Sequence, residues 1–320
     1  MELYRSSSRA HRRSLLILVA WIGLFCRTAQ AAPILYDPDG LAPTNGTLQV
    51  GSLGFDTGNA LAQASIAGGQ IMAGQTFQLF FQTRLTDLAL SPGGGTITPA
   101  GLNGSAGGPA FETTAAGSVT EVVTGVSAGG TVTFATAPVQ SAASFIRMFY
   151  HPGLLSDYFT GAGFTVGTQI LAATPSGGSG NFSLDSANIS PFDSFDPPAS
   201  PPGAAYAGVT SVSGSGGSII NGIVTSSDLN FFKSPIISIR LDAFNNIPFT
   251  STTPSQFFNS FANTPTILAD HGAVDGVTGP DIQFQSRSAG SFAVVPEPAS
   301  ITLLILGLGA LVGWRQRAAR

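Results

Sequence analysis

Hydrophobic and polar residues alternate with a period of two along much of this chain, which predicts half-buried β-strands. In the segment TFQLFFQT, Phe77, Leu79 and Phe81 fall on one face, and in TVTFAT Val132 and Phe134 do so. Further segments with strand-like composition are SFIRMFY, TQILAA, SIINGIVT, SPIISIRLDAF and IQFQSR. Between them lie turn-rich stretches such as SPGGGTITPAGLNGSAGGPA. The pattern therefore indicates a chain made mainly of strands and loops.

We predict an all-β fold for residues 32–294, an antiparallel β-sandwich with long Gly/Ser/Pro-rich loops. The stretch SPFDSFDPPASPPG is the best candidate for a linker or long loop, at residues 190–203. No repeat of fixed period is evident, which argues against a solenoid or a propeller. Only TPSQFFNSFAN has a helical pattern, with Phe257, Phe258 and Phe261 on one side.

Composition supports the β prediction and indicates what fills the core. The chain of 320 residues contains 40 Gly and 21 Pro, and charged residues make up only 9 %. Much of the hydrophobic content is Ala, so we expect packing to depend on the 23 Phe residues. Phenylalanine side chains on one face of a strand more often pack in a hydrophobic core than form a binding surface for a ligand.

The N-terminus has the three parts of a secretory signal peptide. A basic start precedes an apolar run from Leu15 to Phe25, and small residues follow it. Eleven residues are too few to cross about 30 Å of hydrocarbon as a helix. We predict a signal helix within residues 1–31, with cleavage between Ala31 and Ala32, because Ala29 and Ala31 occupy the small-residue positions.

The C-terminus carries a second apolar segment, Ala299 to Trp314, of 16 residues without a charge. As a helix it would be about 24 Å long, slightly short for a permanent membrane span. Arg315, Arg317 and Arg320 follow it and would keep this end in the cytoplasm by the positive-inside rule. The arrangement predicts a short transmembrane helix that stops transfer during export.

Residues 295–320 also resemble a known sorting signal. Pro296-Glu297-Pro298, then the apolar helix, then the arginine-rich tail, is similar to the PEP-CTERM signal of Gram-negative bacteria that make exopolysaccharide. The resemblance implies export by the secretion machinery, transient anchoring through residues 299–314, and processing near Pro-Glu-Pro by exosortase, a membrane-embedded cysteine protease. It also implies a surface or extracellular location. A plain anchor that contains Pro-Glu-Pro by chance is the alternative.

Charge is distributed unevenly along the chain. Eight of the 13 basic residues lie in the two terminal segments, which leaves five basic against 15 acidic residues between positions 33 and 295. Nucleic acid is therefore not an expected partner, because phosphate binding needs a basic surface. The single cysteine, Cys26, lies in the signal segment, so the body has no disulfide and no cysteine-ligated metal.

A serine motif raises one enzymatic alternative. Gly125-Val126-Ser127-Ala128-Gly129 formally matches the nucleophile elbow of hydrolases, in which a strand turns sharply into a helix. Here a second strand-like segment follows, so a hairpin turn explains the same residues. The only bases available in the body are His151 and His271. We therefore expect no enzyme, and a secreted hydrolase using Ser127 is the less favoured alternative.

Metal ligands are sparse, and we expect no cofactor. Two histidines without cysteine do not make an ordinary zinc site. Calcium is a weak alternative, because loop carboxylates offer hard oxygen ligands, although none completes an EF-hand and turn-forming Asp explains them as well. These carboxylates are Asp37, Asp39, Asp193, Asp196, Asp270, Asp275 and Asp281.

The sequence favours a secreted, non-enzymatic surface or extracellular-matrix protein, associated with exopolysaccharide, biofilm or floc as the family resemblance implies. A carbohydrate-binding module or adhesin, with or without calcium, is the alternative. That function needs exposed aromatic side chains on one sheet face, and Tyr150, Tyr158 and Tyr206 are the candidates, since the body has no Trp.

Overall fold

A computed structural model describes the β-rich body of the chain. It describes residues 33–41, 46–63, 71–128, 130–158, 160–184, 211–212, 214–245, 249–250, 256–258, 267–270, 274–277 and 282–294. The signal segment with Ala29, Ala31 and Ala32, the linker at 190–203 and the C-terminal segment 295–320 lie outside these residues. Predictions for those segments are not tested by the fold.

All regular elements in the described part of the chain are strands, as the alternating pattern predicts. They are β1 (Ile34–Tyr36), β2 (Leu48–Gln63), β3 (Thr76–Leu90), β4 (Thr96–Ile97), β5 (Glu112–Val126), β6 (Thr131–Thr136), β7 (Phe145–His151), β8 (Thr168–Leu184), β9 (Ser211–Val212), β10 (Gly214–Ser227), β11 (Ile236–Asn245), β12 (Phe249–Thr250), β13 (Gln256–Phe258), β14 (Ile267–Asp270) and β15 (Ile282–Val294). Seven of these strands have ten or more residues, and β8 has 17.

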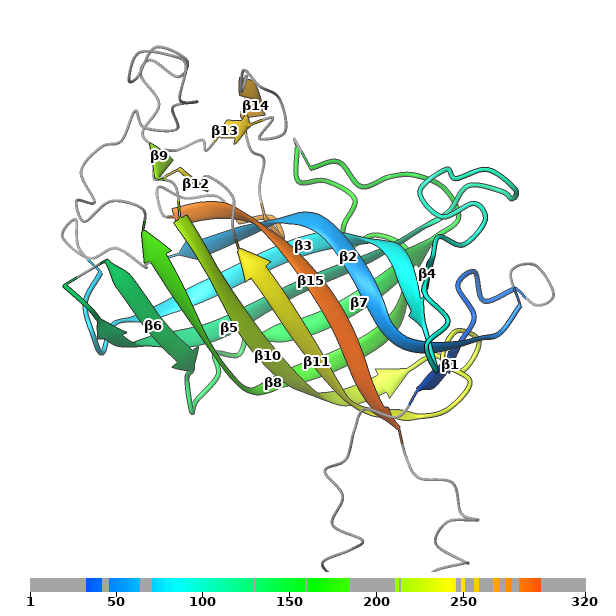
Figure 1. Ribbon diagram of the computed structural model, residues 1–320, viewed down its shortest axis with the longest axis horizontal. Helices are drawn as coiled ribbons and strands as arrows, with labels where there is room; N and C mark the ends of the chain where they lie inside the picture. Colours follow the sequence, from blue (N-terminus) through cyan, green and yellow to red (C-terminus); the bar gives the residue numbers. More distant parts are fainter. Residues whose placement is uncertain are drawn as a thin grey trace, which may run out of the picture. The chain divides into compact units, whose positions relative to one another are not determined.

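Within the described residues, the main sheet has 13 strands and closes on itself (Figure 1). All of its neighbouring strands pair antiparallel, beginning with β2, β3 and β5. Both β6 and β7 lie between β5 and β8, and each pairs with a different part of these two strands. The order then continues from β8 to β10, β11 and β15. The ladder between β15 and β2, which includes Gln283 opposite Leu61 and Ala289 opposite Gly54, completes the circuit. The strands therefore form a single closed sheet. The predicted all-β, antiparallel fold is confirmed, and one closed sheet stands in place of the predicted two-layer sandwich.

The reason for this difference is that alternation specifies one buried face of each strand and no partner for it. A sandwich buries that face against a second sheet, and a closed sheet buries it against its own far wall. The β3 residues Phe77 and Leu79 have the inward-facing, buried positions that the alternation predicts. Long, bulged strands such as β2 allow the strong coiling that closure needs.

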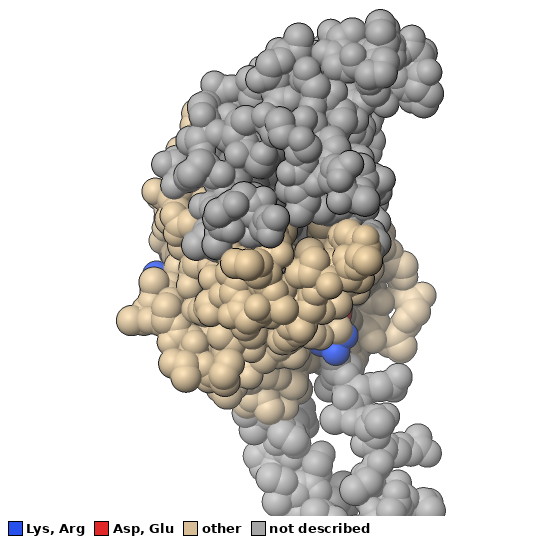
Figure 2. Space-filling model, turned by 90° about the vertical axis from the view of Figure 1, so that its left-hand side faces the viewer, with Lys and Arg blue, Asp and Glu red and all other residues tan. Residues whose placement is uncertain are grey.

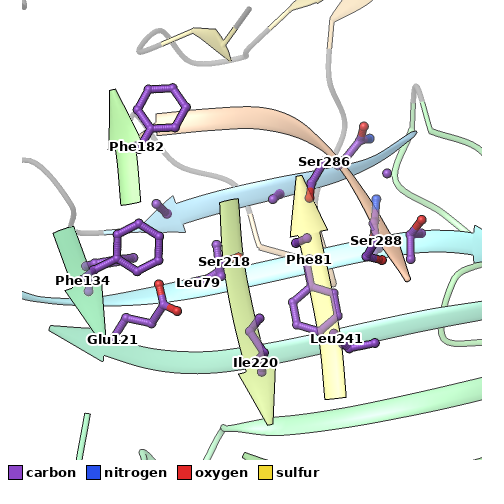
Figure 3. A pocket seen from close by; sticks show the side chains of 18 of the residues that line it. Leu79, Phe81, Glu121, Phe134, Phe182, Ser218, Ile220, Leu241, Ser286 and Ser288 are labelled. Carbon is purple, nitrogen blue, oxygen red and sulfur yellow. The ribbon is translucent and has the colours of Figure 1, made fainter. Parts of the chain in front are cut away.

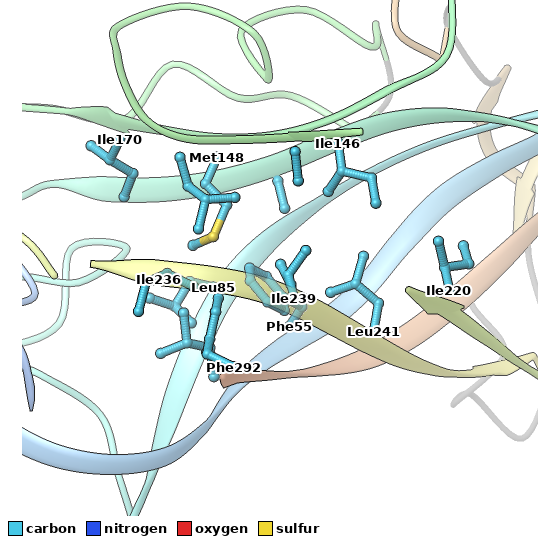
Figure 4. Packing of buried hydrophobic residues seen from close by; sticks show 14 of the residues in the cluster. Phe55, Leu85, Ile146, Met148, Ile170, Ile220, Ile236, Ile239, Leu241 and Phe292 are labelled. Atoms are coloured by element: carbon cyan, nitrogen blue, oxygen red, sulfur yellow. The ribbon is translucent and has the colours of Figure 1, made fainter. Parts of the chain in front are cut away.

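The interior of the closed sheet holds the main hydrophobic core (Figure 4). Side chains from opposite walls meet there, including Phe55, Leu85, Met148, Ile239 and Phe292, which are at most 3 % exposed. At one end of the interior, Tyr36 and Phe292 both pack against Phe232, with ring centroids 5.2 and 5.6 Å apart. Aliphatic and aromatic burial inside the sheet thus stabilises the fold.

Loops cover part of the outer face, and one buried carboxylate ties the loop after β7 to the sheet. Glu112, at the start of β5, accepts hydrogen bonds from the backbone N–H groups of Leu155 and Ser156 at 2.9 and 2.8 Å, and from the Ser156 hydroxyl at 2.7 Å. Arg84 on β3 adds an ion pair to Glu112 at 3.7 Å and donates to Ser156 Oγ at 2.8 Å. The buried charge is therefore fully partnered.

The predicted helix in TPSQFFNSFAN is also replaced by a strand. Gln256–Phe258 forms β13, which pairs antiparallel with β14 and sets Phe257 opposite Ala269. Phe261 lies outside the described residues. A short apolar run does not distinguish helix from strand by its period, and pairing with a neighbouring segment decided between them.

The packing of Leu85 gives a test of the closed core. Leu85→Ala removes a side chain that is 0 % exposed, and we expect it to lower the free energy of unfolding by about 2–5 kcal/mol, because it leaves a cavity between opposite walls. Leu229→Ala is the matched control, since Leu229 is 57 % exposed, and should change the free energy by less than about 0.5 kcal/mol. Urea denaturation measures both. Equal, small effects would contradict the packing described.

Candidate functional site

A cavity of about 100 Å³ lies inside the closed sheet (Figure 3). Its walls are mainly hydrophobic side chains from several strands, among them Leu79, Phe81, Phe134, Ile220 and Leu241. Ser218, Ser286 and Ser288 add hydroxyl groups on β10 and β15. An apolar, concave space with a few polar groups is the usual form of a small-molecule site.

One carboxyl group, that of Glu121 on β5, points into this cavity (Figure 3). Glu121 lies opposite Phe77 of β3 and Thr136 of β6, so its position in the sheet is set by two ladders. It is 1 % exposed, and its Oε2 has no hydrogen-bond partner. Burial raises the pKa of Glu121 to about 8, because the apolar walls disfavour the charged form. Glu121 is therefore protonated at neutral pH.

Aromatic packing shapes the wall beside Glu121. Phe77 and Phe134 meet edge to face, with ring centroids 6.0 Å apart. The Phe134 ring lies over Gly180 of β8, where an added Cβ would come within 2.5 Å of the ring. Glycine at this position of β8 thus makes room for Phe134 at the cavity.

A second polar cluster joins the buried Asp37 to the partly exposed Lys233. Lys233 Nζ lies 3.1 Å from Asp37 Oδ2 and donates to the Asn230 carbonyl at 2.6 Å. Burial raises the pKa of Asp37 and the lysine opposes that shift. Asp39 is also buried. The Lys233 ammonium group thus balances the Asp37 carboxylate, and the Asp-Pro-Asp-Gly segment takes part in an ion pair within the protein.

The other carboxylates considered for calcium do not assemble into a site that the structure shows. No group of three or more His, Cys, Asp or Glu side chains is placed to hold a metal among the described residues. Asp193, Asp196 and Asp281 lie outside those residues, and only the backbone of Asp270 is described.

Asp275 lies in a turn against the outer face of the sheet. Its backbone N–H donates to Gln82 Oε1 at 3.0 Å, and its φ of 52° is in the left-handed region. Burial raises the pKa of Asp275 well above its ordinary value, although hydrogen bonds from the backbone of Gly117 and Phe81 act in the opposite direction. The adjacent Val274 is fully buried in a small cluster with Leu61 and Phe80. Asp275 thus docks the turn to the sheet.

Ser127 and His151 lie at opposite ends of β5. Ser127 is exposed in the turn between β5 and β6, where its Oγ accepts a hydrogen bond from Thr131 N at 3.0 Å. His151 pairs with Glu112, at the other end of this 15-residue strand. The separation along the strand is roughly 50 Å at about 3.3 Å per residue. The structure does not bring the two together, and His271 lies outside the described residues.

The tyrosines predicted to form a sugar platform do not share an exposed face. Tyr150 packs between Phe111 and Phe231, with ring centroids 5.7 and 5.0 Å away. Tyr158 packs against Phe164 at 5.0 Å. Tyr206 lies outside the described residues. The described tyrosines therefore belong to packed ring clusters.

Comparison with protein families adds one finding. The family described as PEP-CTERM protein-sorting motif matches residues 294–318. This is a PEP-CTERM sorting signal. It contains Pro296, Glu297 and Pro298 and confirms the resemblance seen in the sequence, and it implies export, a C-terminal membrane-anchoring tail and processing by exosortase. Comparison with curated proteins and with solved structures found no match.

The PEP-CTERM signal and the cavity occupy separate parts of the chain. The apolar segment of the signal, residues 299–314, is not among the described residues. Within the described ranges, no helix is long and apolar enough to cross a membrane.

Sequence reasoning missed Glu121. A signal was present, because Val119, Glu121 and Val123 share one face of the segment VTEVVTGV, so an acid stands on an otherwise apolar face. The pattern alone does not say that this face lines a cavity inside a closed sheet.

The pKa of Glu121 predicts a pH dependence of stability. Between its ordinary value of 4.5 and about 8, the folded protein holds a proton that the unfolded chain has lost. The free energy of unfolding should therefore fall as pH rises through this window and level off above about 8, at about 1.4 kcal/mol for each pKa unit. In Glu121→Gln this component should be absent.

Urea denaturation from pH 5 to pH 9 measures the difference between the wild type and Glu121→Gln. The pKa values of Asp37 and Asp275 are also raised, but both residues remain in the variant, so the difference isolates Glu121. Parallel stability profiles for the two proteins would show that Glu121 ionises normally.

Proposed function

We propose that this protein is a non-enzymatic component of the cell surface or extracellular matrix, associated with exopolysaccharide, biofilm or floc after exosortase has processed its tail. The observation that carries the proposal is the PEP-CTERM signal at residues 294–318. A sorting signal of this kind directs an exported chain to the cell envelope, so the folded body acts outside the cytoplasm.

The arrangement of nucleophile and base supports a role without catalysis. A serine nucleophile needs a base within hydrogen-bond reach, and the whole length of β5 separates Ser127 from His151. Ser127 Oγ instead holds the turn through Thr131. The serine motif is thus explained by hairpin geometry.

The surface chemistry supports contact with neutral polymers. Figure 2 shows one face of the molecule, where the described residues are almost all uncharged and the basic groups are isolated. On the outer side of β5, β6 and β8, hydroxyl groups pair across strands, as Thr131 with Ser183 at 2.9 Å and Thr124 with Thr133 at 3.0 Å. Polysaccharides offer matching neutral hydrogen-bonding groups, so this surface suits a matrix protein.

A carbohydrate-binding module or adhesin is the second candidate, and one feature of the outer face favours it. A shallow depression over β6, β8, β10 and β11 is lined by Thr133, Asn181, Asp242 and Phe244. Phe244 is 60 % exposed, and its ring offers an apolar surface beside polar groups. Phe244, which the sequence analysis did not single out, replaces the tyrosines as the candidate aromatic contact.

Processing and location test the proposal together. Replacing Pro296, Glu297 and Pro298 by alanine should leave a full-length, membrane-bound precursor, because the substrate motif of exosortase is gone. The wild-type chain, in cells that have the enzyme, should lack Arg320 and co-purify with the exopolysaccharide fraction. Mass spectrometry of membrane, matrix and medium fractions measures both.

Two outcomes contradict different parts of the proposal. A wild-type chain that keeps Arg320 in every fraction would mean that the tail is an ordinary anchor. A processed chain found only in the medium of cells with intact exopolysaccharide would refute the matrix role.

Ser127→Ala tests the absence of catalysis and also serves as the control for processing. Ser127 is exposed in a turn, so the variant should change the free energy of unfolding by about 0.5 kcal/mol or less. It should be processed like the wild type, and esterase and glycosidase assays of the two proteins should be indistinguishable. A hydrolytic activity that disappears in Ser127→Ala would show that the protein is an enzyme.

A further inference from the structure

The cavity inside the closed sheet contains the carboxyl group of Glu121, which lowers the stability of the protein unless it has a binding partner. A buried polar atom without a hydrogen-bond partner costs about 1–3 kcal/mol. Glu121 Oε2 is such an atom, and the apolar residues Leu79, Val123 and Val132 share its cavity. A hydrophobic side chain at position 121 would fill this space at lower cost. The carboxyl group therefore points to a binding partner inside the cavity.

We propose that the cavity binds a small, neutral, mainly apolar molecule that carries one oxygen atom, an alcohol or a carbonyl compound, with the Glu121 carboxyl group as its hydrogen-bond partner. This inference goes beyond the proposed matrix function and does not rest on it.

The lining defines the apolar character and the size of the ligand. Phe77, Phe81, Phe134 and Phe182 present ring surface to the cavity, and Ile220 and Leu241 add aliphatic surface. A dry apolar cavity of about 150 Å³ holds benzene, so the present volume of about 100 Å³ suits a five-membered ring or a chain of about four to six carbons. A sugar or a nucleotide needs many more polar partners than these walls offer.

The electrostatics define the polar group of the ligand. Among the described residues that line the cavity, Glu121 is the only titratable side chain, and burial alone raises its pKa. With a pKa of about 8, the carboxyl group is protonated at neutral pH and donates a hydrogen bond to a ligand oxygen. A cationic ligand would instead require an ionised Glu121. The site therefore selects a neutral oxygen compound over an amine.

Three probes of one shape test the selection: cyclopentanol, methylcyclopentane and cyclopentylamine. We would measure saturation-transfer difference NMR with the full chain in phospholipid nanodiscs at pH 7. We expect cyclopentanol to bind about tenfold more tightly than cyclopentylamine and, once each affinity is corrected for partition from water into hydrocarbon, about tenfold more tightly than methylcyclopentane. A net hydrogen bond to a buried group is worth about 1.4 kcal/mol, which corresponds to this factor.

Two variants connect the binding to the cavity and to Glu121. Val132→Phe fills the cavity and should abolish binding of all three probes, and it also serves as the control for partition into lipid. Glu121→Val should remove the preference for cyclopentanol over methylcyclopentane. Circular dichroism establishes that each variant keeps its β structure.

A pH series keeps the test decisive if Glu121→Val or Val132→Phe does not fold. In the wild type, the preference for cyclopentanol should be lost as pH rises above about 8, where Glu121 ionises, and in Glu121→Gln it should persist to pH 9.5. Equal affinities of cyclopentanol and methylcyclopentane at pH 7 after correction for partition into hydrocarbon, tighter binding of cyclopentylamine, or unchanged binding in a folded Val132→Phe would each overturn the proposal. None of these results bears on where the processed chain is located in the cell.

Discussion

The ladder between β15 and β2 is the interaction on which the rest of this structure depends. It joins the last long strand of the body to the first, and hydrogen-bonds the two edges that an open sheet would expose. Closure of the sheet also creates an enclosed interior. Leu85, Met148 and Ile239 come from separate strands around the sheet, and they share one core only because the circuit is complete.

Closure also explains why two glutamates on one strand have opposite roles. Glu112 faces outward, where a loop supplies two backbone N–H groups and the Ser156 hydroxyl, so its charge is stabilised and holds the loop in place. Glu121 faces inward, where apolar walls raise its pKa to about 8. The first is a structural group, and the second is a buried carboxyl group that faces a cavity. Their difference arises from the side of the sheet that each faces.

The sorting signal and the two pockets of the body are formed by different residues of the chain. The PEP-CTERM signal is a linear segment, residues 294–318, that is recognised by its order of motif, apolar stretch and basic tail. The cavity and the outer depression at Phe244 exist only in the folded sheet.

The sequence by itself determined the strands and the sorting signal. The alternation around Phe77 and Leu79 identifies β3 and its buried face, and Pro296-Glu297-Pro298 with the tail identifies the sorting signal, because both are local patterns. Only the tertiary structure decided which strands pair, and hence that the sheet closes, that Ser127 and His151 lie at opposite ends of β5, and that Lys233 meets Asp37. It also decided that Glu121 lies in a cavity. These contacts join segments far apart in the chain, and a period of two says which face of a strand is buried and nothing about what lies against it.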